Sequence, residues 1–171
     1  YLSIAYLYNP EFFTRARDDC FKMSDDKLTV TNIAEMQWSF QCIYLNKWIE
    51  SISESIATWT FKIDESNGKC NYSIAFVIIS KEVESDKNRP RSLPYYEFLD
   101  IGDFLDRVNP FEGGDEVKIK LDLSAATASI KVNDNDEEIR YKNVNISEAV
   151  KYKMTLLLTP LNGIVSLKDF N

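Results

Sequence analysis

The chain has 171 residues, 44% of them hydrophobic, and a formal net charge of −7. This length and composition predict one domain with a real core, and the acidic balance argues against a broad nucleic-acid surface or an anionic membrane as the main partner. Because the chain contains no histidine, a Ser-His-Asp triad, a Cys-His pair and a His-ligated zinc are excluded within this segment.

The cysteines and the chain start bear on the compartment. Cys20, Cys42 and Cys70 show no CxxC spacing, and their odd number fits buried thiols better than a disulfide framework. We therefore expect a reducing, cytoplasmic compartment. No apolar run is long enough to span a bilayer, so membrane insertion is not expected. The chain begins at Tyr1 without a visible signal peptide, and we expect it to be a segment of a longer polypeptide.

The first twenty residues predict an N-terminal extension that docks on a single domain formed by residues 21–171. Residues 1–8 are aromatic and apolar, and Pro10 ends this stretch because proline lacks the amide donor. Residues 11–19 are mixed, and we expect a helical turn there. A turn signal at Asp25-Asp26 and a short β-branched strand over residues 28–31 follow.

Alternation with a period of two predicts the next strands. It covers residues 38–44 and residues 57–63, where bulky apolar side chains alternate with polar ones. Trp38 and Trp59 lie within these alternating stretches, and we expect both in the core.

The segments around these strands carry turn and loop signals. Residues 46–54 predict a loop with an isolated Trp48. Asn67-Gly68 predicts a hairpin turn, because this pair adopts the backbone angles of a tight two-residue loop. Residues 72–79 are apolar on both faces, which predicts a central strand covered on both sides.

The longest polar stretch, residues 80–94, contains two prolines and predicts an exposed loop. A strand at residues 95–99 and a short helical turn at residues 103–107 are expected next. Four carboxylates at about three-residue spacing predict a solvated face of that turn, in preference to an acid-base pair or a cation site: Glu97, Asp100, Asp103 and Asp106.

The clearest fold signal is the stretch 113–132, which predicts a hairpin whose apolar and charged residues alternate strictly. The acidic run 133–138 predicts a tight turn. It lacks the mid-loop glycine and the distal glutamate of a calcium loop, so no metal site is expected. Further strands are expected at residues 139–144, 152–159 and 164–170, with one helical turn at residues 146–150. Together these elements predict an all-β, antiparallel β-sandwich with one or two short helical turns.

The order of these pieces resembles a SPRY domain. That family has a tryptophan strand, a strand with a Gly-Asp start and a Leu-Asp pair, an Asn-containing hairpin and a final pair of apolar strands. Where the family has a glycine after the hairpin asparagine, this chain has Asp134. The matching segments are Trp59-Thr60-Phe61-Lys62-Ile63, Gly114-Asp115-Glu116-Val117, Leu121-Asp122-Leu123, Ile130-Lys131-Val132-Asn133, residues 152–158 and Val165-Ser166-Leu167 with Phe170.

The resemblance implies a bent sandwich of two antiparallel sheets, of the SPRY or concanavalin-like kind. It also implies a non-catalytic module without a cofactor that holds a protein or peptide at one rim of loops. Such modules often belong to ubiquitin ligases, channels or scaffold proteins, so the chain is a candidate subunit of a large assembly.

Loop composition predicts the partner-binding residues. Trp48 lies in a polar loop without periodic partners, where it either plugs the sandwich end or anchors a ligand. Arginine and tyrosine follow one another at the end of the long loop, a composition favourable for a protein contact, although a flexible, solvated insertion is the competing interpretation. The predicted partner-binding residues are Tyr44, Trp48, Arg89, Arg91, Tyr95, Tyr96 and Asn133.

Three alternatives remain at this point. A lectin-like sandwich would use an exposed Trp48 to stack on a sugar ring. A glycosidase that uses only carboxylates would need two of them facing each other across a cleft, and the sequence fixes no such pair. A purely structural domain packed inside a large complex would need no site.

Overall fold

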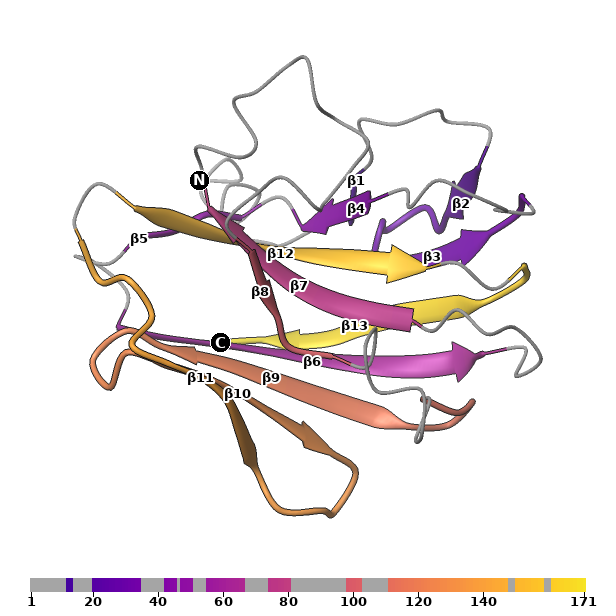
Figure 1. The fold of residues 1–171 in the computed structure, drawn as a ribbon. Coiled ribbons are helices and arrows are strands. Elements are labelled where there is room, and N and C mark those ends of the chain that lie inside the picture. Colours follow the sequence, from indigo (N-terminus) through magenta and orange to yellow (C-terminus); the bar gives the residue numbers. More distant parts are fainter. Residues whose placement is uncertain are drawn as a thin grey trace, which may run out of the picture.

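The computed structural model describes residues 12–13, 20–34, 42–45, 47–50, 55–66, 74–80, 98–102, 111–147, 150–158 and 161–171. In this described part the secondary structure consists of strands, without a helix. The strands form two antiparallel sheets that lie face to face (Figure 1). The all-β sandwich predicted from the sequence is therefore confirmed.

The first sheet has six strands. Their order is β1, β4, β12, β7, β8, and β5 pairs with β12 beside this path. All pairings are antiparallel. The bounds are β1 Phe12–Phe13, β4 Cys42–Leu45, β5 Ile49–Glu50, β7 Ile74–Ser80, β8 Phe98–Asp100 and β12 Lys151–Leu158.

The second sheet has seven strands, in the order β11, β10, β9, β6, β13, β3, β2. The expected hairpin of residues 113–132 is confirmed as β9 and β10, and the last strand has the predicted bounds. The bounds are β2 Phe21–Met23, β3 Thr29–Asn32, β6 Ile56–Glu65, β9 Glu116–Asp122, β10 Thr127–Val132, β11 Glu138–Lys142 and β13 Ile164–Phe170.

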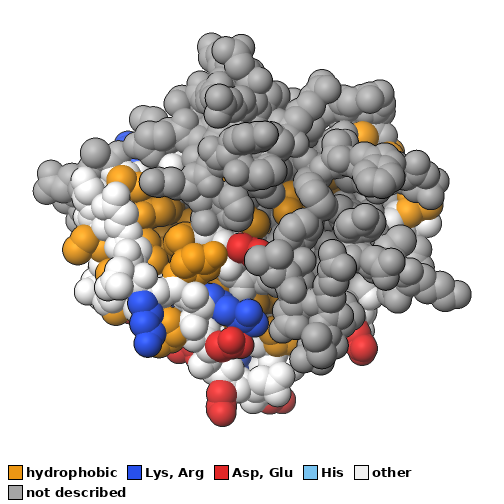
Figure 2. All heavy atoms as spheres, viewed as in Figure 1, with side chains coloured by type: hydrophobic (Ala, Val, Ile, Leu, Met, Phe, Trp, Pro, Cys, Tyr) orange, Lys and Arg blue, Asp and Glu red, His pale blue; other side chains and the backbone are white. Residues whose placement is uncertain are grey.

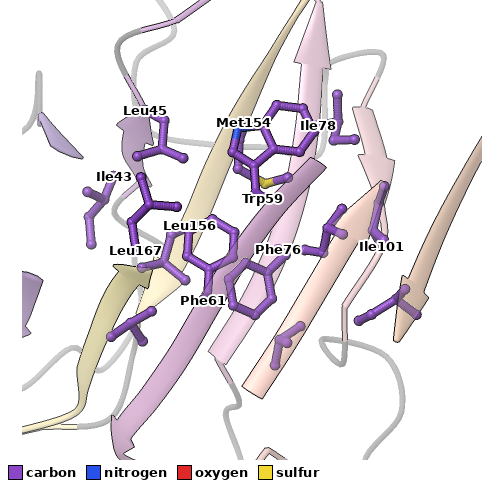
Figure 3. Packing of buried hydrophobic residues seen from close by; sticks show 14 of the residues in the cluster. Ile43, Leu45, Trp59, Phe61, Phe76, Ile78, Ile101, Met154, Leu156 and Leu167 are labelled. Atoms are coloured by element: carbon purple, nitrogen blue, oxygen red, sulfur yellow. The ribbon is translucent and has the colours of Figure 1, made fainter. Parts of the chain in front are cut away.

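The core lies between the two sheets and is built from alternate residues of their strands. On β6, Trp59, Phe61 and Ile63 are fully buried. The ring centroids of Phe61 on β6 and Phe76 on β7 lie 4.7 Å apart, so the aromatic contact joins the two sheets (Figure 3). Aromatic burial of this kind dominates the apolar area removed from water, and it explains why period-two patterning determines the layers.

Strand β7 is buried on both faces. All seven residues of Ile74–Ser80 are buried, and its register pairs it with β12 on one side and β8 on the other. Phe76 and Ile78 belong to the core between the sheets, whereas Val77 and Ile79 point away from it. The prediction of a central strand covered on both sides is confirmed.

The hairpin predicted at Asn67-Gly68 is wrong. Strand β6 pairs with β9 and β13, whereas β7 pairs with β12 and β8 in the other sheet. The chain therefore crosses from one sheet to the other between these strands. An Asn-Gly pair favours a tight turn locally, but it does not determine which strands share hydrogen bonds.

Two local predictions also need correction. The expected loop at residues 46–54 contains the short strand β5, which pairs with β12. The helical turn expected at residues 11–19 is wrong for Phe12–Phe13, which form β1. At residues 146–150, the described part shows one hydrogen bond from the Val150 amide to the Ser147 carbonyl, at 3.0 Å, and no helix.

Other predictions concern residues outside the described part. These are the stretch 1–8, Trp38, residues 81–94 of the expected loop, the strand start at residues 95–97 and the helical turn at residues 103–107. The first residue of the expected loop, Ser80, is instead the buried end of β7. Within the described residues, the structure contains no helix that is long and apolar enough to cross a membrane.

Candidate functional site

One end of the six-stranded sheet gathers several of the predicted site elements. Lys153 on β12 pairs with Ile79 on β7, and Ile79 pairs with Phe98 on β8. One residue earlier on β12, Tyr152 pairs with Ile49 on β5. We call this place, formed by β5 and the paired residues Lys153, Ile79 and Phe98, the Trp48 end.

Trp48 is fixed against a buried cation at this end. The Lys153 ammonium Nζ lies 4.6 Å from the centroid of the Trp48 ring. Lys153 is only 3% exposed, whereas Trp48 is partly exposed. A cation–π contact of this desolvated kind contributes about 2 kcal/mol. Trp48 is therefore a positioned aromatic side chain with an accessible part.

Tyr44 lies on the same face of the sheet. Its neighbours Ile43 and Leu45 belong to the core between the sheets, so Tyr44 points away from that core. The alternation over residues 38–44, which put Tyr44 on the same face as Trp38, therefore predicted the wrong buried face at this strand. Tyr44 pairs with Thr155 on β12, two residues after Lys153. The structure thus brings two predicted site residues, Tyr44 and Trp48, to one face of one sheet.

The described residues on both sides of the segment 81–97 lie at the Trp48 end. Residues 81–97, which include Arg89, Arg91, Tyr95 and Tyr96, lie outside the described part. Their flanking residues are described: Ser80 pairs with Tyr152, and Phe98 pairs with Ile79. Paired strands lie about 4.8 Å apart, so the chain leaves and re-enters the sheet next to Lys153.

Asn133 lies on the other sheet, in the turn between β10 and β11. Its side-chain oxygen accepts a hydrogen bond from the Glu116 amide at 2.9 Å, and its amide nitrogen donates to the Asp115 carboxylate at 2.8 Å. Its φ of 53° is left-handed, which asparagine tolerates better than most residues. The structure gives Asn133 a role in the turn and does not bring it next to Tyr44 or Trp48.

Asp100 was expected on a solvated helical face, and this expectation is wrong. It is the last residue of β8 and half-buried, and its amide donates to the Tyr141 hydroxyl of β11 at 3.0 Å. Burial raises the pKa of the Asp100 carboxyl to about 6, while the charge of Arg140 and the Gly102 amide lower it in part. The strand expected at residues 95–99 is found at Phe98 and Leu99, but it extends to Asp100, which the three-residue spacing of the acidic residues did not predict.

Two buried polar atoms lie in one row across this sheet. The register joins Tyr44 to Thr155, Thr155 to Val77 and Val77 to Asp100. Among the residues that the structure describes, no hydrogen-bond partner reaches Thr155 Oγ1 or Asp100 Oδ1. Unpaired buried polar groups are rare and costly in folded proteins, so this row is chemically distinct from the apolar core.

Metal ligands do not gather in the described part of the chain. Within those residues, no three His, Cys, Asp or Glu side chains come together as a metal site. The acidic run 133–138 forms the turn between β10 and β11, and Glu137 accepts a hydrogen bond from Ser129 and pairs with Lys120 at 3.0 Å. These contacts lower the pKa of Glu137 and stabilise the turn.

Sequence comparison finds no matching family model and no matching curated protein. Comparison of structures does find similar folds. The SPRY domain of human HERC1 has a TM-score of 0.56 at 12% identity, over 88% of this chain and 92% of that one. The NHR domain of Neuralized from Drosophila melanogaster has a TM-score of 0.66 at 11% identity, over 95% and 93%.

A third solved structure, the TRIM65 PSpry domain, has a TM-score of 0.58 at 10% identity and covers 98% of both chains. Nearly the whole chain is thus shared with each of these domains, although few residues are identical. The resemblance inferred from the order of the strand motifs is confirmed at the level of the fold: this chain is a SPRY-like β-sandwich.

Proposed function

We propose that the domain is a non-catalytic protein-interaction module that binds a peptide or protein segment at the Trp48 end. The observation that carries the proposal is the placement of Trp48 over Lys153, beside both attachment points of the long loop. A partly exposed aromatic side chain on a rigid sheet, next to loops, is typical of a binding hot spot.

Three further features support the proposal. The fold is shared with SPRY and NHR domains, and the resemblance implies protein binding at one rim. The predicted residues Tyr44 and Trp48 lie on one face of the six-stranded sheet. Arg89, Arg91, Tyr95 and Tyr96 belong to the segment 81–97, whose flanking residues Ser80 and Phe98 lie at this end. Because Asn133 has bonding partners of its own in a turn of the other sheet, we assign it no contact with the partner.

The test is a comparison of variants in binding a partner. The immobilised domain would be used to isolate a protein from the source cell, and the affinity of the purified partner would then be measured by calorimetry. Trp48→Ala is expected to weaken binding at least tenfold, because hot-spot truncations cost about 2 kcal/mol or more. Arg91→Ala together with Tyr96→Ala should weaken binding with a nearly unchanged melting temperature.

The matched control is Asp136→Ala, in the exposed turn of the other sheet. It should leave both affinity and melting temperature unchanged. Because Trp48 also covers Lys153, Trp48→Phe is included as a variant that keeps an aromatic face and the fold. If Trp48→Ala binds as tightly as the wild type, the Trp48 end is not the binding site.

We also propose that the domain works in a reducing, cytoplasmic compartment. Cys20 is a buried thiol at the start of the described domain, which fits the sequence-based expectation of cysteines used as small hydrophobic residues.

A further inference from the structure

Asp100 is a half-buried carboxyl group at the end of β8. It lies two residues after Phe98 and therefore close to the Trp48 end, on the same face as Val77, Thr155 and Tyr44. Successive residues of a strand rise about 3.3 Å, so Asp100 lies about 7 Å along β8 from Phe98. A partner segment bound beside Trp48 and Lys153 would therefore pass near the carboxyl group.

The carboxylate of Asp100 is incompletely satisfied. Its Oδ1 is buried, and among the described residues no donor reaches this atom. The backbone of Asp100 is held in place by the hydrogen bond to Tyr141, and the Ile101 amide that follows is bonded to the Phe76 carbonyl at 2.9 Å. These two hydrogen bonds fix the backbone of the segment, so the position from which the Asp100 side chain projects is defined.

Among the described residues, the charge that acts on Asp100 comes from β11. Arg140 is the neighbouring cation that attracts the carboxylate, but its Nη2 lies 3.2 Å from the Glu138 carboxylate, so its charge is shared. Tyr141 contributes its hydroxyl, and the residues of β7 that pair with β8 are Val77, Ile78 and Ile79, which do not ionise. Arg140 therefore compensates Asp100 only in part.

The coloured residues on the face shown in Figure 2 do not form a large patch of one charge sign. On the face shown in Figure 2, acidic and basic side chains lie close together among the coloured residues, below a group of hydrophobic ones. Selection by charge on this face would therefore depend on single, poorly compensated groups. Asp100 is such a group, and the net charge of −7 favours the approach of a basic partner over longer distances.

We propose that Asp100 is a subsite that pairs with a lysine or arginine side chain of the bound partner segment. This inference rests on the proposed function, because it assumes a segment bound at the Trp48 end. Charge in a carboxylate is shared by both oxygens, so a cation beside the accessible part of Asp100 stabilises the charge that burial of Oδ1 leaves poorly solvated. A charge-assisted hydrogen bond to an ammonium or guanidinium group supplies this stabilisation.

The subsite couples partner binding to pH. The carboxyl titrates near pH 6 because it is buried, so it is about nine-tenths ionised at pH 7 and about one-tenth ionised at pH 5. A cation binds the ionised form, and the apparent dissociation constant varies inversely with the fraction of that form. Affinity for a basic segment should therefore fall about tenfold between pH 7 and pH 5.

The experiment follows the Asp100 carboxyl directly. Carbon-13 NMR of the labelled chain would give the pKa of Asp100, first alone and then with the amide-capped single residues of arginine and lysine as probes. We expect both cationic probes to shift the Asp100 resonance and to lower its pKa. Capped citrulline and capped acetyl-lysine, which have nearly the same shape without the charge, should do neither.

The variants separate this inference from the proposed function. Asp100→Asn keeps the shape and should abolish the pH dependence of binding, while Asp136→Asn, with the same change in charge, should retain it. An unchanged Asp100 resonance with every probe, or an equal response to citrulline and arginine, would overturn the subsite. If Trp48→Ala weakens partner binding but Asp100→Asn leaves its pH dependence intact, the proposed function stands and the subsite does not.

Discussion

Single residues in this domain owe their properties to contacts that lie far away in sequence. Asp100 and Tyr141 are separated by 41 positions, yet the Asp100 amide donates to the Tyr141 hydroxyl. Asn133 bonds to Glu116 across the β9–β10 hairpin. In both cases the residue type is common in exposed loops, and the partner determines whether the residue acts in a turn or in a half-buried site.

The raised pKa of Asp100 predicts a pH-dependent stability. The ordinary value of 3.8 applies to the unfolded chain and a value of about 6 to the folded one. The folded state therefore favours the protonated carboxyl, and this contribution to stability is complete below about pH 4 and is lost as the pH rises through 6. Urea unfolding of wild type and Asp100→Asn measures the difference.

Between pH 4 and pH 7, the unfolding free energy of Asp100→Asn should rise by about 1 to 2 kcal/mol relative to that of the wild type. This is less than the full pKa shift implies, because the carboxyl group is partly exposed to solvent. Asp136→Asn, in the exposed turn, serves as the control. If the difference in unfolding free energy between Asp100→Asn and the wild type stays constant from pH 4 to pH 7, the ionised Asp100 carboxylate does not destabilise the folded state.

At the level of the element, β8 is held by close packing of Gly102 against β7. The amides of Ile101 and Gly102 both donate to the Phe76 carbonyl, at 2.9 and 3.2 Å. A Cβ atom on Gly102 would lie 3.0 Å from the Phe76 ring and 3.1 Å from the Phe76 backbone nitrogen. The backbone atom cannot move aside as a flexible side chain would, so glycine is required here for close approach.

Gly102→Ala is therefore expected to destabilise the domain by about 1 to 3 kcal/mol, the usual cost of overpacking. The loss should concentrate at the edge of the six-stranded sheet, because β8 is the last strand in its order and pairs with β7. Chemical denaturation measures the total loss of unfolding free energy, and hydrogen exchange of the β7 and β8 amides shows where in the sheet the loss occurs. Gly114→Ala is not a matched control, since its φ of 99° adds backbone strain; Gly113, whose nearest neighbour would lie at 3.5 Å, is suitable. Equal stability of Gly102→Ala and the wild type would contradict the packing argument.

At the level of the whole molecule, aromatic side chains join the two sheets. Phe76 on β7 contacts Phe61 on β6, and its ring centroid lies 5.6 Å from that of Phe111. Figure 3 shows Phe61 and Phe76 facing each other between the sheets, with Met154 near Trp59. On the opposite face of β7, Val77 pairs with Asp100 of β8 and Ile79 pairs with Phe98.

Phe76→Ala should cost about 3 to 5 kcal/mol of unfolding free energy, because it removes a fully buried ring and leaves a cavity between the sheets. Urea denaturation followed by tryptophan fluorescence is a suitable measurement, since Trp59 lies in the same core. Ile146→Ala, at a side chain that is 55% exposed, is the control and should change stability little. A small effect of Phe76→Ala would mean that the two sheets do not depend on this contact.

The sequence by itself determined most of the longer strands and, for several of them, the buried face, whereas it missed β1 and β5. Alternation along β6 and along the β9–β10 hairpin predicted which residues are buried, because the period of a strand is a local property. The same patterns, in their order, were enough to indicate a SPRY-like sandwich. The position of Trp48 outside any periodic stretch also marked it as unusual.

Only the tertiary structure decided how the strands are shared between the sheets. The Asn67-Gly68 pair suggested a hairpin, but β6 and β7 belong to different sheets, because pairing depends on hydrogen bonds to β9, β12 and β13 that are distant in sequence. It also decided that Trp48 covers Lys153 and that Asp100 is half-buried beside β11. Burial and hydrogen-bond partners are properties of the assembled sheets, and for this reason the chemistry of Asp100 is not visible in the residues around it.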